Sequence, residues 1–179
     1  MSELNTERLH LRKFIPTDLE AFYQLNSDLE VIKYIRPGSP FTKAEVETWL
    51  KIKIRHWQEH HFGIWVMEYK QDNSIVGFCG LQYLENTSQV EVGYRLAKRY
   101  WQQGLATEAA KASIQYGFDI INLNEIVGIT HPENLKSQRV LTKIGLSYRK
   151  EAYFYNTDVK YFSISRAEYN NSAFYKPNL

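Results

Sequence analysis

The sequence predicts an α/β fold in which a mixed, mostly antiparallel sheet of about seven strands is flanked by helices. Two observations carry this prediction. Before Gly63, apolar residues recur mainly at helical spacing, whereas three runs after it read as strands joined by short polar turns. Helices then alternate with further strands. We expect a single domain spanning residues 1–179.

The part of the chain before Gly63 is predicted to be helical after one alternating strand at residues 8–13. Residues 17–20, Thr-Asp-Leu-Glu, match a capping box that starts a helix, and a short helical piece is expected at residues 29–35. A second capping box, Thr-Lys-Ala-Glu at residues 42–45, starts a longer helix with apolar residues at helical spacing.

The rest of the chain is predicted from the change of period after Gly63. The predicted elements are, in order, strands at residues 64–69, 75–84 and 89–96, a helix at 104–121, a strand at 125–130, a helix at 134–144, and strands at 147–155 and 159–166. Hairpin connections among the first three of these strands imply antiparallel pairing.

Composition excludes several classes of protein. Hydrophobic residues make up 44% and charged residues 23%, which is ordinary for a globular protein. A net charge of +2 without a long basic run gives no reason to expect a nucleic-acid partner. The single cysteine excludes an internal disulfide framework. Neither a signal-type N-terminus nor a long apolar stretch is present, so we expect no membrane partner and a cytoplasmic location.

The most informative segment is residues 95–108, where an alternating strand passes through a glycine turn directly into a helix. Such a turn leaves backbone N–H groups unpaired, and together with the positive end of the helix dipole they form a site for phosphate. Lys98 and Arg99 precede the turn at Gly104. An ordinary strand-to-helix connection would carry the same local pattern.

A second segment, residues 134–146, reads as a well-capped helix. Asn134 is a favourable N-cap residue and Gly145 a favourable C-cap residue. Ser137 lies in the first turn, at the position where a capping box usually has Glu or Gln. Capping alone therefore explains Ser137 less well than it explains Asn134 and Gly145.

Two other patterns are weaker candidates for chemistry. His56-Trp-Gln-Glu-His60 matches an inverted zinc-protease motif, but Trp57 lies on the apolar stripe and no carboxylate-bearing helix follows. A solvated helix end explains the motif better, and we expect no metal. Cys79 lies in an apolar strand without a nearby histidine or cation, so we expect a buried residue rather than a nucleophile.

Together, the two informative segments resemble the cofactor-binding motifs of the GNAT acetyltransferase superfamily, and the match spans essentially the whole chain. Residues 6–12, 16–20 and 158–166 are similar to the branch that acetylates ribosomal-protein N-termini. The resemblance implies a GNAT-like sheet and acetyl-CoA as co-substrate. It also implies the cofactor-binding residues Leu96, Gln102, Gln103, Gly104, Leu105, Ala106, Thr107, Asn134 and Ser137.

The catalytic residues that the resemblance implies are Glu91, as a base or by ordering water, and Ser137, as a donor to the departing thiolate. Alternation places Glu91 with Gly93 and Arg95, and an exposed or Arg95-paired strand residue is the alternative interpretation. The chain departs from the family pattern at two positions. Trp101 replaces a common Gln or Arg, and Leu141 replaces a tyrosine that serves as acid in many members.

These residues lead us to expect direct acetyl transfer in a ternary complex to a primary amine, with the α-amine of a protein N-terminus as the favoured acceptor. A small amine, such as a polyamine, an aminoglycoside or an amino-acid derivative, is an alternative acceptor. A non-catalytic acyl-CoA-binding module is a second alternative, suggested by Leu141, and a zinc peptidase is a third. A homodimer is compatible with the sequence.

Overall fold

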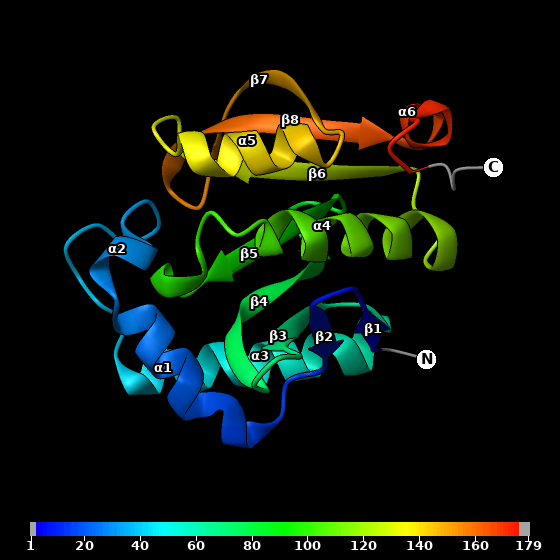
Figure 1. Cartoon of the computed structure of the whole chain (residues 1–179). Coiled ribbons are helices and arrows are strands. Elements are labelled where there is room, and N and C mark those ends of the chain that lie inside the picture. The colour runs from blue at the N-terminus through cyan, green and yellow to red at the C-terminus, as the bar shows by residue number, and fades with distance from the viewer. Residues whose placement is uncertain (1–2, 176–179) are drawn as a thin grey trace.

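The computed structural model describes residues 3–175 and contains an eight-stranded sheet with the order β1-β2-β3-β4-β5-β6-β8-β7 (Figure 1). Neighbouring strands are antiparallel except β5 and β6, which are parallel. The strands are β1 (Leu4–Asn5), β2 (Leu9–Arg12), β3 (Ile64–Tyr69), β4 (Ser74–Tyr83), β5 (Val90–Leu96), β6 (Glu125–Thr130), β7 (Ser147–Phe154) and β8 (Thr157–Ser165).

Helices cover both faces of this sheet. They are α1 (Leu19–Ser27), α2 (Leu29–Ile32), α3 (Lys43–His60), α4 (Leu105–Gln115), α5 (Leu135–Lys143) and α6 (Arg166–Asn171), with short 3₁₀ turns η1 (Pro16–Asp18) and η2 (Lys98–Tyr100). Alternate residues of β3 separate two apolar clusters, as strand geometry requires. Trp65 and Met67 pack with α4 and α5, whereas Ile64 and Val66 pack with α1 and α3.

The prediction of a mixed, mostly antiparallel sheet flanked by helices is confirmed, but the sheet has eight strands rather than about seven. The additional strand is β1, which is only two residues long and pairs with β2. Two residues are too few for an alternating pattern to appear in the sequence. The helix α6 was also not predicted, although Ser165 and Glu168 form a capping box at its start.

Two further predictions need correction. The helix expected at residues 104–121 ends as α4 at Gln115, and a π-helical turn, η3 (Tyr116–Ile120), continues it. The capping box expected at residues 17–20 does not form, because η1 precedes α1 and Asp18 instead accepts the Ile15 N–H at 2.9 Å. The second capping box is confirmed, with Thr42 and Glu45 bonding each other's backbone.

None of the helices in residues 3–175 is long and apolar enough to cross a membrane.

Candidate active site

The parallel pair β5 and β6 separates toward its carboxyl ends. The two strands are in register only at Glu91 and Val127, although both continue beyond this pair. In Figure 1 the arrowheads of β5 and β6 point the same way and diverge. Since α4 follows β5 and α5 follows β6, the first turns of both helices lie at this edge. Such a crevice at the carboxyl ends of parallel strands is where α/β folds bind ligands.

The turn before α4 presents backbone donors, as the sequence predicts. Gln102 and Gly104 have positive φ values of 61° and 80°, which reverse the chain at the start of the helix. Gly104 is the N-cap residue, and no side chain caps the first turn. The N–H groups of Leu105, Ala106 and Thr107 therefore have no partner among the described residues. Three free donors at a helix N-terminus fit a pyrophosphate group.

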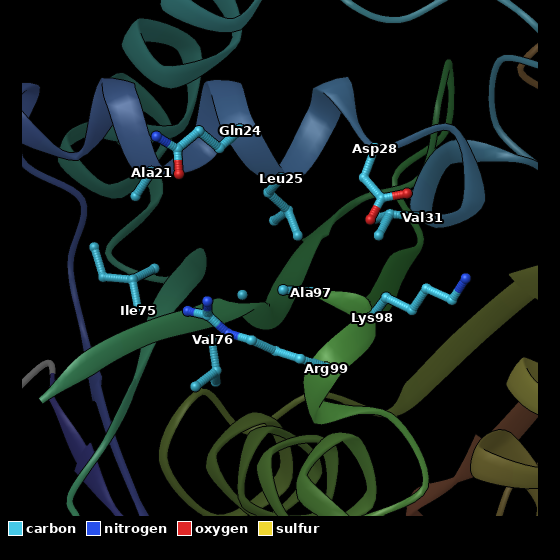
Figure 2. Close-up of a pocket in the computed structure, with 11 residues that line it drawn as sticks. Ala21, Gln24, Leu25, Asp28, Val31, Ile75, Val76, Ala97, Lys98 and Arg99 are labelled. Atoms are coloured by element: carbon cyan, nitrogen blue, oxygen red, sulfur yellow. The ribbon is translucent and has the colours of Figure 1, made fainter. Parts of the chain in front are cut away.

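A cavity of about 730 Å³ lies beside this turn, between α1 and the facing ends of β4 and β5. Figure 2 shows Gln24, Leu25 and Asp28 along one wall and the cations Lys98 and Arg99 along the other. Lys98 lies 3.8 Å from Glu30 of α2. The two cations that the sequence places before the turn thus line a hollow on the α1 side of it.

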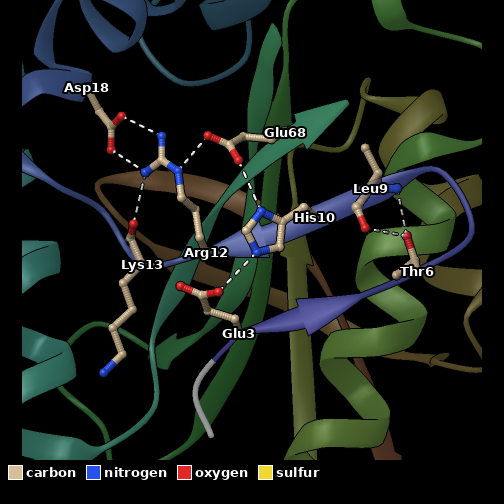
Figure 3. A network of polar contacts seen from close by, with 8 residues as sticks. All are labelled: Glu3, Thr6, Leu9, His10, Arg12, Lys13, Asp18 and Glu68. Carbon is tan, nitrogen blue, oxygen red and sulfur yellow. Dashed lines mark hydrogen bonds and ion pairs between the residues drawn. The ribbon is translucent and has the colours of Figure 1, made fainter. Parts of the chain in front are cut away.

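The turn is braced from the N-terminal segment. Arg8 donates to the Glu108 carboxylate through Nε at 2.7 Å and to the Gln103 carbonyl at 2.8 Å. Thr6 donates to Glu108 at 2.6 Å, and its hydroxyl also contacts Leu9 in Figure 3. Burial alone would raise the pKa of Glu108, but the bonds from Thr6 and Arg8 outweigh it and lower this pKa.

Arg12, the last residue of β2, holds this strand to its surroundings. Its guanidinium donates to both Asp18 oxygens, at 2.9 and 2.8 Å, and to Glu68 at 2.6 Å (Figure 3). The N-terminal strands are thereby held both to β3 and to α4.

The first turn of α5 brings a second set of predicted residues to the crevice. Asn134 caps the helix by accepting the Ser137 N–H at 3.1 Å. The Ser137 hydroxyl lies 3.0 Å from the hydroxyl of Tyr94, which also donates to the Ser137 carbonyl. Burial raises the pKa of Tyr94 well above its ordinary value, so this phenol stays protonated and acts as a hydrogen-bond donor.

Leu96 and Trp101 lie at the end of β5. The Ala97 N–H donates to Val76 on β4, so the Leu96 N–H points to the opposite edge of the strand, toward the crevice. The Leu96 carbonyl accepts the Trp101 indole N–H at 2.8 Å. Lys136 of α5 lies 4.5 Å above the Trp101 ring. Trp101 thus links the end of β5 to α5 through side-chain contacts and leaves the turn's backbone donors free.

Glu91 is buried, with 4% of its surface exposed. Its Oε1 accepts Gln82 Nε2 at 2.6 Å and the Tyr155 hydroxyl at 2.8 Å, whereas its Oε2 has no partner among residues 3–175. Burial raises the pKa of Glu91 and outweighs these hydrogen bonds. A carboxylate with a raised pKa is suited to accept a proton near neutral pH.

Neither alternative interpretation of Glu91 describes this environment, because the side chain is buried and Arg95 does not contact it directly. Arg95 instead donates to Asn26 of α1. A Cβ atom at Gly93, between Glu91 and Arg95, would meet no atom within 4 Å. Open space therefore lies beside Glu91 on the face of β5 that α1 and α3 cover.

With this geometry in place, comparison with known proteins decides the family. Residues 8–147 match the family model described as an acetyltransferase (GNAT) domain. The chain belongs to the GNAT acetyltransferase family. An uncharacterized N-acetyltransferase p20 from Bacillus licheniformis is 34% identical over 94% of this chain and 99% of its own length.

Two more similar proteins bear on the activity and the fold. The FsC-acetyl coenzyme A-N(2)-transacetylase of Aspergillus fumigatus is 32% identical, over 87% of this chain and 68% of its own length. The crystal structure of a GNAT acetyltransferase from Bacillus anthracis is 28% identical with a TM-score of 0.78, covering 91% of this chain and 98% of that one. The chain is an N-acetyltransferase of GNAT type, and acetyl-CoA is its co-substrate.

The candidate site also includes residues that the sequence did not single out. Gln82 and Tyr155 hold the Glu91 carboxylate, and Tyr94 holds the Ser137 hydroxyl. Alternation puts Tyr94 on the face opposite Glu91, but no local pattern connects it to a serine 43 residues later. The position at which many family members have a tyrosine is filled by Leu141, which is 1% exposed and packs into the core.

The other candidate motifs take different roles. No group of three or more His, Cys, Asp or Glu residues in the described part of the chain could hold a metal ion. Burial lowers the pKa of His56 to about 4, so this imidazole is neutral at physiological pH. Cys79 is buried as expected, and burial raises its thiol pKa to about 12, which leaves no thiolate for nucleophilic attack.

Proposed function

We propose that this protein transfers an acetyl group from acetyl-CoA directly to the α-amine of a polypeptide N-terminus, with both substrates bound together. The observation that carries this proposal is the position of Glu91. One of its carboxylate oxygens lacks a partner among the described residues, and open space adjoins it at Gly93. An α-amine, with a pKa of about 7.7–8.0, needs only a modest base, whereas a lysine amine near 10.4 needs a stronger one.

The residues divide the chemistry between the two faces of β5. Bound acetyl-CoA supplies an acyl thioester, and the free N–H groups at residues 105–107 and the Leu96 N–H are the donors that would hold it. Glu91 accepts the amine proton as the new N–C bond forms. Ser137 donates a hydrogen bond to the departing sulfur, assisted by the positive end of α5.

Tyr94 acts in this scheme as a positioning residue. Its hydroxyl donates to the Ser137 carbonyl, so the Ser137 hydroxyl can donate to the phenol oxygen at rest and rotate toward the sulfur during the reaction. With its raised pKa, Tyr94 is itself a poor proton donor to a thiolate. The scheme therefore needs no hydroxyl at Leu141.

The names of similar proteins do not agree on which amine is acetylated. The names state FsC for the Aspergillus relative, spermidine for an Escherichia coli relative, and ribosomal L7/L12 for a solved structure of the same fold. We favour the α-amine because the N-terminal segment and the final strand resemble the ribosomal-protein branch. A small amine is the alternative acceptor.

A coenzyme-A release assay with a panel of amines tests this proposal. The panel contains peptides that begin with Ser or Ala, the same peptides with a blocked α-amine, spermidine, an aminoglycoside and an amino-acid derivative. We expect the free peptides to give the highest kcat/KM and the blocked peptides to be inert. Faster turnover of spermidine or another small amine would favour the alternative acceptor. Binding of acetyl-CoA without turnover of any amine would indicate a non-catalytic module.

Two further proposals concern the whole protein. We place it in the cytoplasm, because its single cysteine is buried and forms no disulfide. We also propose a homodimer, for which the exposed Tyr148 and Tyr153 on the edge strand β7 offer a surface. Light scattering of the purified protein measures its molar mass and thus whether it is a dimer.

A further inference from the structure

The face of β4 and β5 opposite α4 has polar side chains at both ends and none in the middle. Three cross-strand pairs form this surface: Phe78↔Arg95, Gly80↔Gly93 and Gln82↔Glu91. Since the central pair consists of two glycines, no side chain of these strands separates Glu91 from Arg95. The open space at Gly93 is therefore flanked by an acid on one side and a cation on the other.

Arg95 has no carboxylate partner among residues 3–175. Its Nη1 donates to Asn26, and its guanidinium lies 5.3 Å from the Phe78 ring centroid. Its Nε is buried and has no hydrogen-bond partner. Burial lowers the pKa of Arg95 to about 10, so the side chain is still charged at neutral pH. A partly buried cation without an opposite charge is unfavourable unless something else supplies that charge.

Lys53 of α3 is a second cation beside this surface, at the end formed by Gln82 and Glu91. Its Nζ donates to Gln82 Oε1 at 2.6 Å and lies 5.5 Å from the Trp49 ring centroid. The centroids of the Trp49 and Phe78 rings are 5.2 Å apart. Lys53 lies over the first ring and Arg95 over the second, so the two cations contact one continuous aromatic surface. Burial lowers the pKa of Lys53, Arg95 lowers it further, and Glu91 opposes both.

The charge balance of this cluster points to the ligand. Lys53 and Arg95 carry two positive charges, whereas Glu91 carries one negative charge and loses it on accepting a proton. Glu85, a second carboxylate near Glu91, accepts the Tyr155 backbone N–H and lies beyond the Gln82–Glu91 end of the surface, so it does not balance the charge of Arg95. A polycationic amine would be repelled here, whereas an acceptor with a carboxylate would balance the excess charge. We propose that the amine acceptor also carries a carboxylate, which binds between Lys53 and Arg95 while its amine faces Glu91. This inference rests on the proposed function, because it names the class of acceptor for that site.

Spacing indicates where the carboxylate lies on the acceptor. Glu91 and Arg95 are four residues apart on one strand, which is about 13 Å between their Cα atoms. The amine and the carboxylate are therefore several bonds apart. In a peptide whose second residue is acidic, the α-amine and the side-chain carboxylate are several bonds apart. The same is true of a free amino acid whose amine lies at the far end of its chain.

The test compares acceptors that differ only in charge. The peptide arm uses Ser-Glu, Ser-Gln and Ser-Lys N-termini, and the free-ligand arm uses γ-aminobutyrate and its amide. We expect the Glu peptide to exceed the Gln peptide in kcat/KM by about 10- to 100-fold, the range for a hydrogen bond to a charged group. The Lys peptide should be slowest. The arm that shows the larger effect identifies the source of the carboxylate.

Variants assign the preference to the two cations. Arg95→Gln and Lys53→Gln should each reduce the Glu-over-Gln preference, whereas Arg95→Lys should retain most of it. Lys51→Gln is the matched control, because Lys51 lies two residues from Lys53 on α3, is 71% exposed and pairs with Glu47. If Arg95→Gln does not fold, Lys53→Gln and the series of acceptor peptides still test whether the site recognises a carboxylate on the acceptor.

The outcomes separate this inference from the proposed function. Equal constants for the Glu and Gln peptides would overturn the inference and leave the proposed function standing. An equal loss of activity on both peptides in Arg95→Gln and Lys53→Gln would also overturn it, because a purely structural role predicts that result. No turnover with any amine would overturn both.

Discussion

Replacing Glu91 by glutamine removes the proposed proton acceptor and keeps the shape of the side chain. Glutamine retains an oxygen that can accept the bonds from Gln82 and Tyr155, so the buried contacts persist. We expect kcat/KM for an N-terminal peptide to fall by about 10- to 100-fold, or about 1.4–2.7 kcal/mol in barrier height. The loss stays at the low end of acid–base effects because positioning of the substrates remains.

The loss should depend on pH in a specific direction. At pH 6.5 only about one α-amine in twenty is neutral if its pKa is about 7.8, so the base matters most there. At pH 9 most of the amine is already neutral, and the difference between Glu91→Gln and the wild type should shrink. A rate–pH profile from pH 6.5 to pH 9, measured by coenzyme-A release for the wild type and for Glu91→Gln, gives the loss of rate at each pH. Glu59→Gln, at an exposed carboxylate near the end of α3, is the control.

Stability should change in the opposite sense to activity. Burial raises the pKa of Glu91, so the native state binds a proton more tightly than the unfolded chain. Its contribution to stability is then fully present below the unfolded pKa, near 4.3, and is lost as pH rises through the folded pKa. Glu91→Gln should therefore be at least as stable as the wild type at pH 8 by thermal melting.

The result that would refute the base role of Glu91 comes from the activity measurements: an unaltered rate–pH profile in Glu91→Gln.

Three other substitutions test the cofactor side. Ser137→Ala should lower kcat by about 10-fold with little change in acetyl-CoA affinity by calorimetry, and an unchanged kcat would remove Ser137 from the chemistry. Gly104→Ala forces a side chain into a φ of 80°, at a cost of about 1–2 kcal/mol, and should lower both Tm and acetyl-CoA affinity. Unchanged affinity there would contradict the phosphate-binding role of the turn. Glu108→Gln should lower Tm at pH 7 by weakening the bonds from Arg8, and this difference should vanish as pH falls through the lowered Glu108 pKa. A constant difference in Tm down to pH 3 would show that the charge of Glu108 does not matter.

Local sequence signals predicted the parts of the site that depend on neighbouring residues. Gly104 adopts the positive φ that its turn requires, and Asn134 caps α5 as its residue type indicates. Alternation on β5 placed Glu91 on one face and Tyr94 on the other, because successive side chains of a strand point in opposite directions. These features need only the backbone geometry of a few consecutive residues.

The tertiary structure alone decided what each side chain meets. Tyr155 reaches Glu91 from a turn 64 residues later, and Lys53 joins the same cluster from α3 through Gln82. Arg95 could have paired with Glu91 by its spacing, yet it bonds Asn26 because α1 packs over that end of β5. Periodicity specifies a face but not the element that covers it. The turn at Gly104 and the helix at residues 134–146 therefore indicated the cofactor together, through a family resemblance visible in the sequence. The charges beside Glu91, on which the acceptor depends, arose only when distant helices and turns packed together.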